Sequence, residues 1–245
     1  MRVRAVVAYD GTDYGGFQRQ RNAPTIQAEL ESALSEITGR PTRILAAGRT
    51  DAGVHAIAMP VVFDTERDIP EDGWVRGLNT TLPDDLSVLD ASAVPDDFDP
   101  RRWAVGKTYR YQVWTAPWRS ALLGRYAWHV PRALDLDAMR EASIYLLGEN
   151  DFSSFRAREC DSRTTTRNVE RIVIAGESGG LVRIEISANA FLRKMARIMA
   201  GTLVEVGWGR YQPEDVADML AARDRTAAGR TAPAHGLFLV EVRYA

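Results

Sequence analysis

Apolar residues recur along the chain with two periods, one typical of helices and one typical of strands. Helical spacing runs over residues 25–38, where apolar side chains lie three or four positions apart and Gly39 follows as a stop signal. Strict alternation runs over residues 107–115 and places Tyr109 and Tyr111 on one face of a half-buried strand. The chain therefore mixes helices with strands.

The same patterns predict the remaining elements. Strands are expected over 3–9, 43–47, 56–63, 86–89, 107–115, 168–175, 181–187 and 237–244, and helices over 25–38, 74–82, 136–147 and 192–206, with a further short helix opening at Pro213. Several strands are joined by short turns, which is typical of antiparallel pairing. We expect an α+β fold with a largely antiparallel sheet, divided near the polar stretch 92–102 into halves 1–100 and 101–245.

Composition narrows the function classes. The 245 residues contain one cysteine and three histidines, which disfavours a disulfide framework and a multi-ligand metal site. We therefore expect no metal. No apolar run approaches the roughly 20 residues of a membrane span, so a cytoplasmic location is expected.

The near-zero net charge hides a segregation. Residues 64–99 carry eleven acids and two arginines, a net charge of −9, so the total of −2 leaves +7 on the rest of the chain. Of the 31 basic residues, 29 are arginines, which suits bidentate contacts to phosphate, although a compositional bias explains the same count. We expect a one-sided distribution of charge, with the acidic segment turned away from the basic surface.

The most informative segment is Gly-Arg-Thr-Asp-Ala-Gly at 48–53. Residues two apart in an extended chain point the same way, so Arg49 and Asp51 are expected on one side of a tight loop between strands. A nearby arginine favours the ionised carboxylate that a nucleophile requires. By spacing alone, the pair is equally consistent with an ordinary surface ion pair.

This segment resembles the signature of the tRNA pseudouridine synthase A family, in which the aspartate of the Arg-Thr-Asp-Ala-Gly run is catalytic. Other segments resemble the family's conserved blocks in the same order. They are the opening block Tyr-Asp-Gly-Thr-Asp-Tyr-Gly-Gly-Phe at 9–17, Lys-Thr-Tyr-Arg-Tyr at 107–111, Asp-Phe-Ser-Ser-Phe-Arg at 151–156, Ala-Asn-Ala-Phe-Leu at 188–192, Gly-Thr-Leu-Val-Glu-Val-Gly at 201–207 and Thr-Ala-Pro-Ala-His-Gly-Leu at 231–237.

The resemblance implies a pseudouridine synthase fold, in which two α/β halves share the sheet around a central cleft. It also implies isomerisation of uridine to pseudouridine at positions 38, 39 and 40 of the tRNA anticodon stem-loop, without cofactor or metal. A base in an RNA stem must be flipped out to be reached. Relatives work as homodimers that hold tRNA through arginines, so tRNA and a second copy are the expected partners.

The resemblance also assigns residues to roles. Asp51 is the nucleophile and attacks either C6 of uracil or C1′ of ribose. Tyr109 stacks on the flipped base, and Arg49 either fills the gap that this base leaves or pairs with Asp51. Arg197 is expected to pair with Asp51. Arg193 is expected to contact substrate from the same helix face, although such a face is often merely solvated.

Two positions depart from the family pattern, and two other function classes stay open. Lys194 stands where many relatives have histidine, and Arg230 replaces a common proline, which makes the shape of that loop uncertain. A non-catalytic tRNA-binding protein or chaperone of the same fold is the main alternative. A small-molecule enzyme with an aspartyl nucleophile is less favoured, because no phosphate-binding glycine-rich loop accompanies the carboxylate.

Overall fold

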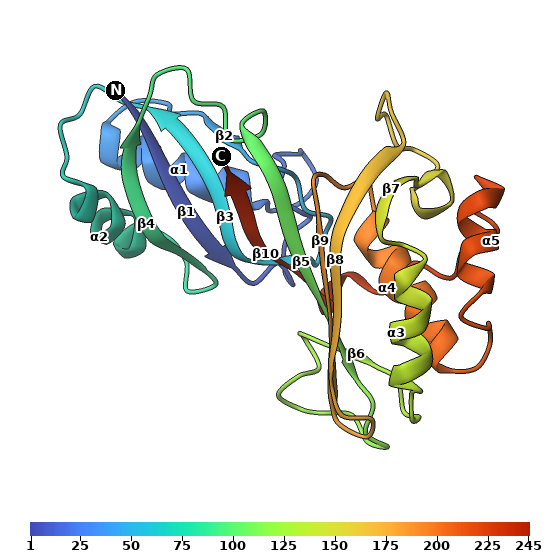
Figure 1. The fold of residues 1–245 in the computed structure, drawn as a ribbon. Helices are drawn as coiled ribbons and strands as arrows, with labels where there is room; N and C mark the ends of the chain where they lie inside the picture. Colours follow the sequence, from blue (N-terminus) through green and yellow to red (C-terminus); the bar gives the residue numbers. More distant parts are fainter. The chain divides into compact units, whose positions relative to one another are not determined.

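A computed structural model describes residues 1–245, which form two compact units (Figure 1). Unit 1 contains residues 1–105 and 238–245, and unit 2 contains residues 106–237. Each unit has its own strands and helices. The final strand therefore belongs to unit 1, whereas a simple cut near residue 100 assigns it to the second half.

Five strands of unit 1 form its sheet. They are β1 (Arg2–Tyr9), β2 (Ile44–Ala46), β3 (His55–Asp64), β4 (Leu86–Val94) and β10 (Leu237–Tyr244). Strand β1 lies between β4 and β3 and is antiparallel to both, while β10 runs parallel to β3 at Phe238 and Leu239. Alternate residues of β1 are buried, as a strand with one face on a core requires.

Two helices accompany this sheet. Helix α1 (Ile26–Thr38) begins where the Thr25 hydroxyl accepts a hydrogen bond from the Ala28 amide, and it ends at Gly39 in the left-handed conformation. Its apolar stripe, which includes Leu30 and Leu34, is buried. Helix α2 (Glu71–Thr81) packs along β4. The helical period in residues 25–38 thus predicts the buried face correctly.

Unit 2 contains a second antiparallel arrangement. Its elements are β5 (Ala104–Trp114), β6 (Trp128–His129), β7 (Gly148–Asp151), β8 (Thr166–Gly176), β9 (Leu181–Ala188), helices α3 (Leu136–Ile144), α4 (Met195–Gly207) and α5 (Asp215–Ala222), and the 3₁₀ turns η1 (Ser153–Phe155) and η2 (Ala234–Gly236). The strand order β5-β9-β8-β7 is antiparallel throughout, and β6 pairs with β5 in parallel. Helix α3 packs on α4 and β8.

Helix α4 is buried over its whole length, because its sequence is apolar on nearly every face. It begins at Met195, three residues later than the predicted start at 192. Lys194 adopts a left-handed backbone conformation with φ 63°, which interrupts the helix there. No helix of the chain combines the length and the apolar character that crossing a membrane requires.

The predicted α+β class with largely antiparallel pairing is confirmed. Most predicted elements are present, and β4 extends to Val94, which shortens the polar stretch expected at 92–102. The sheet shared by both halves, the central cleft and the domain boundary at 100 stay predictions.

Candidate functional site

Asp51 lies in the loop that joins β2 to β3 in unit 1. Its side chain is half-buried, and its backbone carbonyl accepts a hydrogen bond from the Val54 amide at 3.1 Å. The loop thus turns within four residues, as the sequence predicts. A turn of this kind presents its central side chains and leaves little freedom in its backbone.

The segment 9–17, which follows from β1, braces this loop. The Phe17 amide donates to the Thr50 carbonyl at 3.1 Å, and the Tyr9 and Thr50 hydroxyls lie 2.9 Å apart. Gly16 has φ 107°, and a Cβ atom there would lie 2.8 Å from the Thr50 carbonyl oxygen. Only glycine accommodates both the conformation and the approach. Thr50, the residue before Asp51, is therefore held from two directions.

His55 fixes the other end of the loop. It is fully buried and stacks on Phe238 with 4.6 Å between ring centroids. Its Nδ1 lies 3.1 Å from the Gly11 amide nitrogen and 3.0 Å from Asp10 Oδ1. When Nδ1 carries no proton, it accepts a hydrogen bond from the Gly11 amide. When Nδ1 carries a proton, it donates to the Asp10 carboxylate. These contacts give His55 a structural role in the loop.

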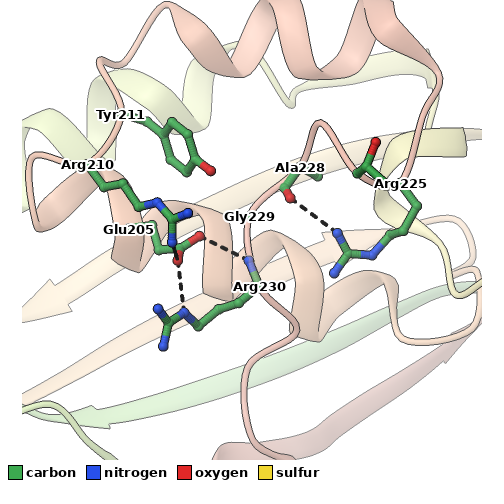
Figure 2. A pocket seen from close by; sticks show the side chains of 8 residues that line it. Glu205, Arg210, Tyr211, Arg225, Ala228, Gly229 and Arg230 are labelled. Atoms are coloured by element: carbon green, nitrogen blue, oxygen red, sulfur yellow. Dashed lines mark hydrogen bonds and ion pairs between the residues drawn. The ribbon is translucent and has the colours of Figure 1, made fainter.

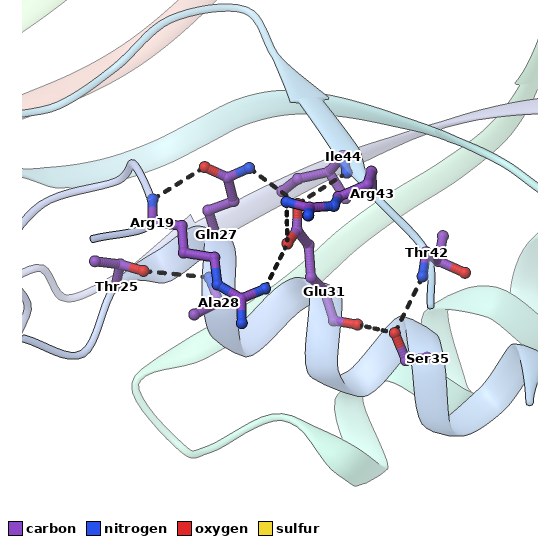
Figure 3. A network of polar contacts seen from close by, with 9 residues as sticks. All are labelled: Arg19, Thr25, Gln27, Ala28, Glu31, Ser35, Thr42, Arg43 and Ile44. Atoms are coloured by element: carbon purple, nitrogen blue, oxygen red, sulfur yellow. Dashed lines mark hydrogen bonds and ion pairs between the residues drawn. The ribbon is translucent and has the colours of Figure 1, made fainter. Parts of the chain in front are cut away.

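The strand that leads into the loop is fixed by a buried carboxylate (Figure 3). Glu31 of α1 accepts hydrogen bonds from Gln27 Nε2 at 2.9 Å and from the Ile44 amide at 3.3 Å. Arg19 and Arg43 approach its Oε2 at 3.3 and 3.8 Å. Ile44 begins β2, so the Glu31 network ties α1 to the strand that ends just before the Asp51 loop.

Arg49 does not pair with Asp51, and this part of the sequence-based expectation is wrong. Arg49 is exposed and forms no ion pair. The argument from spacing needs extended strand geometry, but β2 ends at Ala46 and β3 begins at His55. Residues 49 and 51 lie in the turn between them, where side chains no longer alternate with period two.

In unit 2, the structure separates the two tyrosines of β5. Tyr111 is 1% exposed, and its hydroxyl donates to the Pro233 carbonyl at 2.8 Å. Burial raises the pKa of Tyr111 far above its ordinary value, and the Arg197 charge opposes this shift only partly. Tyr109 remains partly exposed and meets Phe191 edge-on, with 4.9 Å between centroids. Tyr111 is thus the core residue, and Tyr109 is the more exposed of the two.

Arg193 and Arg197 do not share a helix face, in contrast to the predicted spacing. Helix α4 begins only after Lys194, whose backbone is left-handed, so Arg193 lies before the helix and Arg197 lies within it. Arg193 is exposed and donates to the Glu159 carbonyl at 3.1 Å. Arg197 is half-buried in the first turn of α4, where its Nε donates to the Ala232 carbonyl at 2.8 Å. Arg197 is therefore not on a simply solvated face.

The segment 229–236 lies directly on α4. A Cβ atom at Gly201 would overlap the Arg230 carbonyl, so this glycine permits the backbone contact. The Ala232 amide donates to the Arg197 carbonyl at 3.1 Å. These contacts explain the glycine at position 201 of α4. The backbone of segment 229–236 packs against Gly201, so this position is not open to a phosphate.

A polar cluster that sequence reasoning missed lies beside this segment (Figure 2). Glu205 is fully buried in α4, and its Oε1 accepts from Arg210 Nη1 at 2.7 Å and from Arg230 Nε at 2.8 Å. The Arg230 amide donates to Oε2 at 3.0 Å, and the Arg230 guanidinium lies 4.9 Å from the Trp208 ring centroid. The sequence does contain a signal for this cluster, because Glu205 lies inside the apolar run of α4 and a buried carboxylate needs a hydrogen-bonding partner.

The site residues are thus distributed over the two units. Asp51 and Arg49 belong to unit 1, and Tyr109, Arg193 and Arg197 belong to unit 2. Within unit 2, Arg197 and Tyr111 are both held by the segment 232–233.

Comparison with known proteins gives a family. The family model "tRNA pseudouridine synthase" matches residues 5–101 and 142–245. Two proteins named tRNA pseudouridine synthase A are similar over 243 residues: that of Myxococcus xanthus (46% identical, 99% of this chain and 92% of the relative) and that of Syntrophotalea carbinolica (47%, 99% and 96%). A solved structure of a Cbf5-Nop10-Gar1 complex matches with TM-score 0.39 and 12% identity, covering 97% of this chain and 48% of that chain. By the family match and these identities, the chain belongs to the tRNA pseudouridine synthase family, a family of isomerases.

Proposed function

We propose that this family member isomerises uridine to pseudouridine on the 3′ side of the tRNA anticodon stem-loop, with Asp51 as the nucleophile. The observation that carries this proposal is the bracing of the Asp51 loop by Phe17, Tyr9 and His55. A catalytic group must be held within a fraction of an ångström of its productive position. Backbone contacts on both sides of Asp51 supply such support.

The reaction suits a carboxylate without a cofactor. The bond between N1 of uracil and C1′ of ribose breaks, the base turns, and a bond forms between C5 and C1′. The C5 proton is lost to solvent, N1 takes up a proton, and Asp51 is released unchanged, so the product is an isomer of the substrate. Nothing is oxidised or reduced. Asp51 adds either to C6 of the ring or to C1′, and both routes need the same ionised carboxylate. Water must be kept from the cleaved intermediate, since hydrolysis leaves an abasic site.

The other residues take supporting roles in the proposal. Tyr109, partly exposed and supported edge-on by Phe191, stacks on the flipped base. Arg49, exposed and without an ion-pair partner, occupies the space that the base leaves. The pairing of Arg197 with Asp51 and the homodimer rest on the family resemblance. A contact from Arg193 to substrate rests on its spacing in the sequence, and a cytoplasmic location rests on the composition and the lack of long apolar runs.

The test is release of tritium from tRNA transcripts labelled at C5 of uridine, combined with mapping of pseudouridine positions. The wild-type protein should form pseudouridine in the anticodon stem. Asp51→Asn should lower the rate by roughly a thousandfold or more, because an amide is a poor nucleophile. Binding of tRNA, measured separately by filter retention, should survive this change.

Asp84→Asn is the matched control. Asp84 is an exposed carboxylate of unit 1 with no ion pair, so its loss changes the net charge equally and should leave the rate unchanged. Turnover retained by Asp51→Asn would remove Asp51 from the mechanism. Binding of tRNA by the wild type without any tritium release would instead identify a non-catalytic tRNA-binding protein of the same fold.

A further inference from the structure

A hollow of about 290 Å³ lies in unit 2, lined by residues that follow η1 and residues that follow α5. Its charged lining consists of Arg156, Arg158, Arg223 and Arg225 and a single carboxylate, Asp224. We call this hollow the arginine pocket. The two segments that build it are about 65 positions apart in the sequence and meet because α5 packs on η1.

The pocket is built on fixed supports. The buried rings of Phe152 and Phe155 anchor η1 directly before Arg156. The Ala157 amide then donates to the Arg193 carbonyl at 2.9 Å. On the other side, Arg223 Nε forms an ion pair with Asp151 Oδ2 at 3.3 Å. The arginines are thus presented from positioned backbone and not from a loose loop.

The positive charge of the pocket is compensated only in part, because Asp151 pairs with Arg223 and Asp224 is the single carboxylate of the lining. Arg156 is half-buried and Arg158 is exposed, and neither forms a hydrogen bond or an ion pair. Arg225 donates only to neutral acceptors, the Ala228 carbonyl at 3.2 Å and the Thr231 hydroxyl at 3.0 Å. Burial lowers the pKa of Arg225. The nearby charge of Glu205 raises this pKa, and the charge of Arg158 lowers it. Guanidinium groups stay protonated regardless, so the repulsion persists.

Several other arginines of this chain differ from Arg156 and Arg158 because they have a carboxylate partner. Arg110, for example, meets Glu185 at 2.7 Å. An adjoining hollow of about 360 Å³ shares Arg225 and is also lined by Arg210 and Arg230, but these two already hold the buried Glu205 (Figure 2). Of these two hollows, the arginine pocket is therefore the one in which no arginine is paired with a buried carboxylate.

We propose that the arginine pocket binds a backbone phosphate of the tRNA substrate, an inference that rests on the proposed function. Guanidinium groups form paired, charge-assisted hydrogen bonds to phosphate oxygens, and several arginines around one hollow match the charge of a phosphodiester. Contacts to phosphates set the position of a nucleic acid on a protein without reading its sequence. The pocket thus holds tRNA while other residues perform the chemistry.

The experiment measures tRNA affinity against salt concentration for the full chain. The double variant Arg156→Gln and Arg158→Gln should bind tRNA roughly tenfold more weakly. The slope of log affinity against log salt should fall by about one for each lost phosphate contact. Because neither side chain forms a hydrogen bond or an ion pair within the protein, the variant should keep the wild-type unfolding midpoint, which is measured alongside.

Two further variants sharpen the test. Arg76→Gln removes one exposed positive charge from α2 in the acidic segment 64–99 and should leave affinity and slope unchanged. Asp224→Asn removes the only carboxylate of the pocket and should tighten tRNA binding about two- to threefold. Its amide oxygen still accepts from the Thr226 backbone, so that turn is retained.

The outcomes separate the two proposals. Unchanged affinity and slope in the double variant, with pseudouridine still formed by the wild type, would overturn the pocket and leave the proposed function intact. If the double variant lost binding of inorganic phosphate but kept the wild-type affinity for tRNA, the pocket would be a site for a free anion. That result would also overturn the proposal. Weaker tRNA binding by the double variant, together with a wild type that binds tRNA but forms no pseudouridine, would support the pocket and refute the isomerase. A wild type that does not bind tRNA would refute both.

Discussion

Each unit contains one buried glutamate approached by two arginines, yet the two clusters are built on different principles. Glu31 in unit 1 has its shortest hydrogen bond, 2.9 Å, from the neutral Gln27 side chain. The Ile44 amide and Arg19 both donate at 3.3 Å, and Arg43 stands 3.8 Å away (Figure 3). Glu205 in unit 2 is held by the arginines themselves, at 2.7 and 2.8 Å, and by one amide (Figure 2).

The difference shows how buried charge can serve two purposes. In unit 1, the carboxylate ties a helix to the strand before the Asp51 loop, and its arginines stay mostly in solvent. In unit 2, the carboxylate fixes two arginines beside the arginine pocket, where Arg230 also stacks on Trp208. Removing the charge of Glu205 therefore removes the partner of two arginines, whereas removing that of Glu31 removes the acceptor of the amide at the start of β2.

The largest effect on stability is expected for Glu205→Ala. The change leaves the Arg230 amide without its acceptor and removes the partner of two guanidinium groups, although these are about half exposed and regain water. We expect a loss of about 3 kcal/mol in the free energy of unfolding, at the low end for a broken buried pair. Urea denaturation measures it. Glu185→Ala, which breaks a similarly short but one-third exposed pair, should cost less than about 1 kcal/mol. Equal losses in the two variants would contradict the comparison.

Arg230→Pro restores the residue that the family pattern favours and should cost about 2 kcal/mol in this chain. Proline has no amide hydrogen for Glu205 Oε2 and no group to stack on Trp208. Arg230→Lys keeps the amide and a charge, so denaturation should show a loss about half as large. A proline variant as stable as the wild type would mean that Arg210 alone satisfies Glu205.

Glu31→Ala should cost about 1.5 kcal/mol and should also slow pseudouridine formation severalfold. It leaves the Ile44 amide without an acceptor at the start of β2, and this strand ends just before the Asp51 loop. Glu36→Ala on the exposed face of α1 is the control and should change neither quantity. A stability loss with an unchanged rate would show that the Glu31 network does not position the loop.

The sequence predicted the periodic parts of this fold well. Residues 25–38 and 107–115 carry clear helical and strand periods, and both become α1 and β5. Period and caps are local properties, so they can be recognised without tertiary contacts. The bracing of the Asp51 loop by the segment 9–17 is not local, and its contacts became clear only from the structure.

The failures share one physical cause. Arg49 was expected to pair with Asp51, and Arg193 was expected on the helix face of Arg197, because a regular period was extended into residues that leave it. A turn at 47–54 ends the strand period, and the left-handed Lys194 ends the helical one. The Glu205 cluster was missed because its partner Arg230 lies 25 positions away, where no sequence period connects the two residues.

The smallest effect is expected for Arg43→Ala, and it tests the comparison most directly. Arg43 approaches Glu31 at 3.8 Å, and its side chain is 80% exposed, so solvent screens the pair and the side chain retains most of its freedom. We expect a loss of no more than about 0.5 kcal/mol by urea denaturation, against the larger loss for Arg230→Pro. A loss above about 1 kcal/mol would mean that the arginines, and not the neutral donors, hold Glu31. In that case the two units would use one principle.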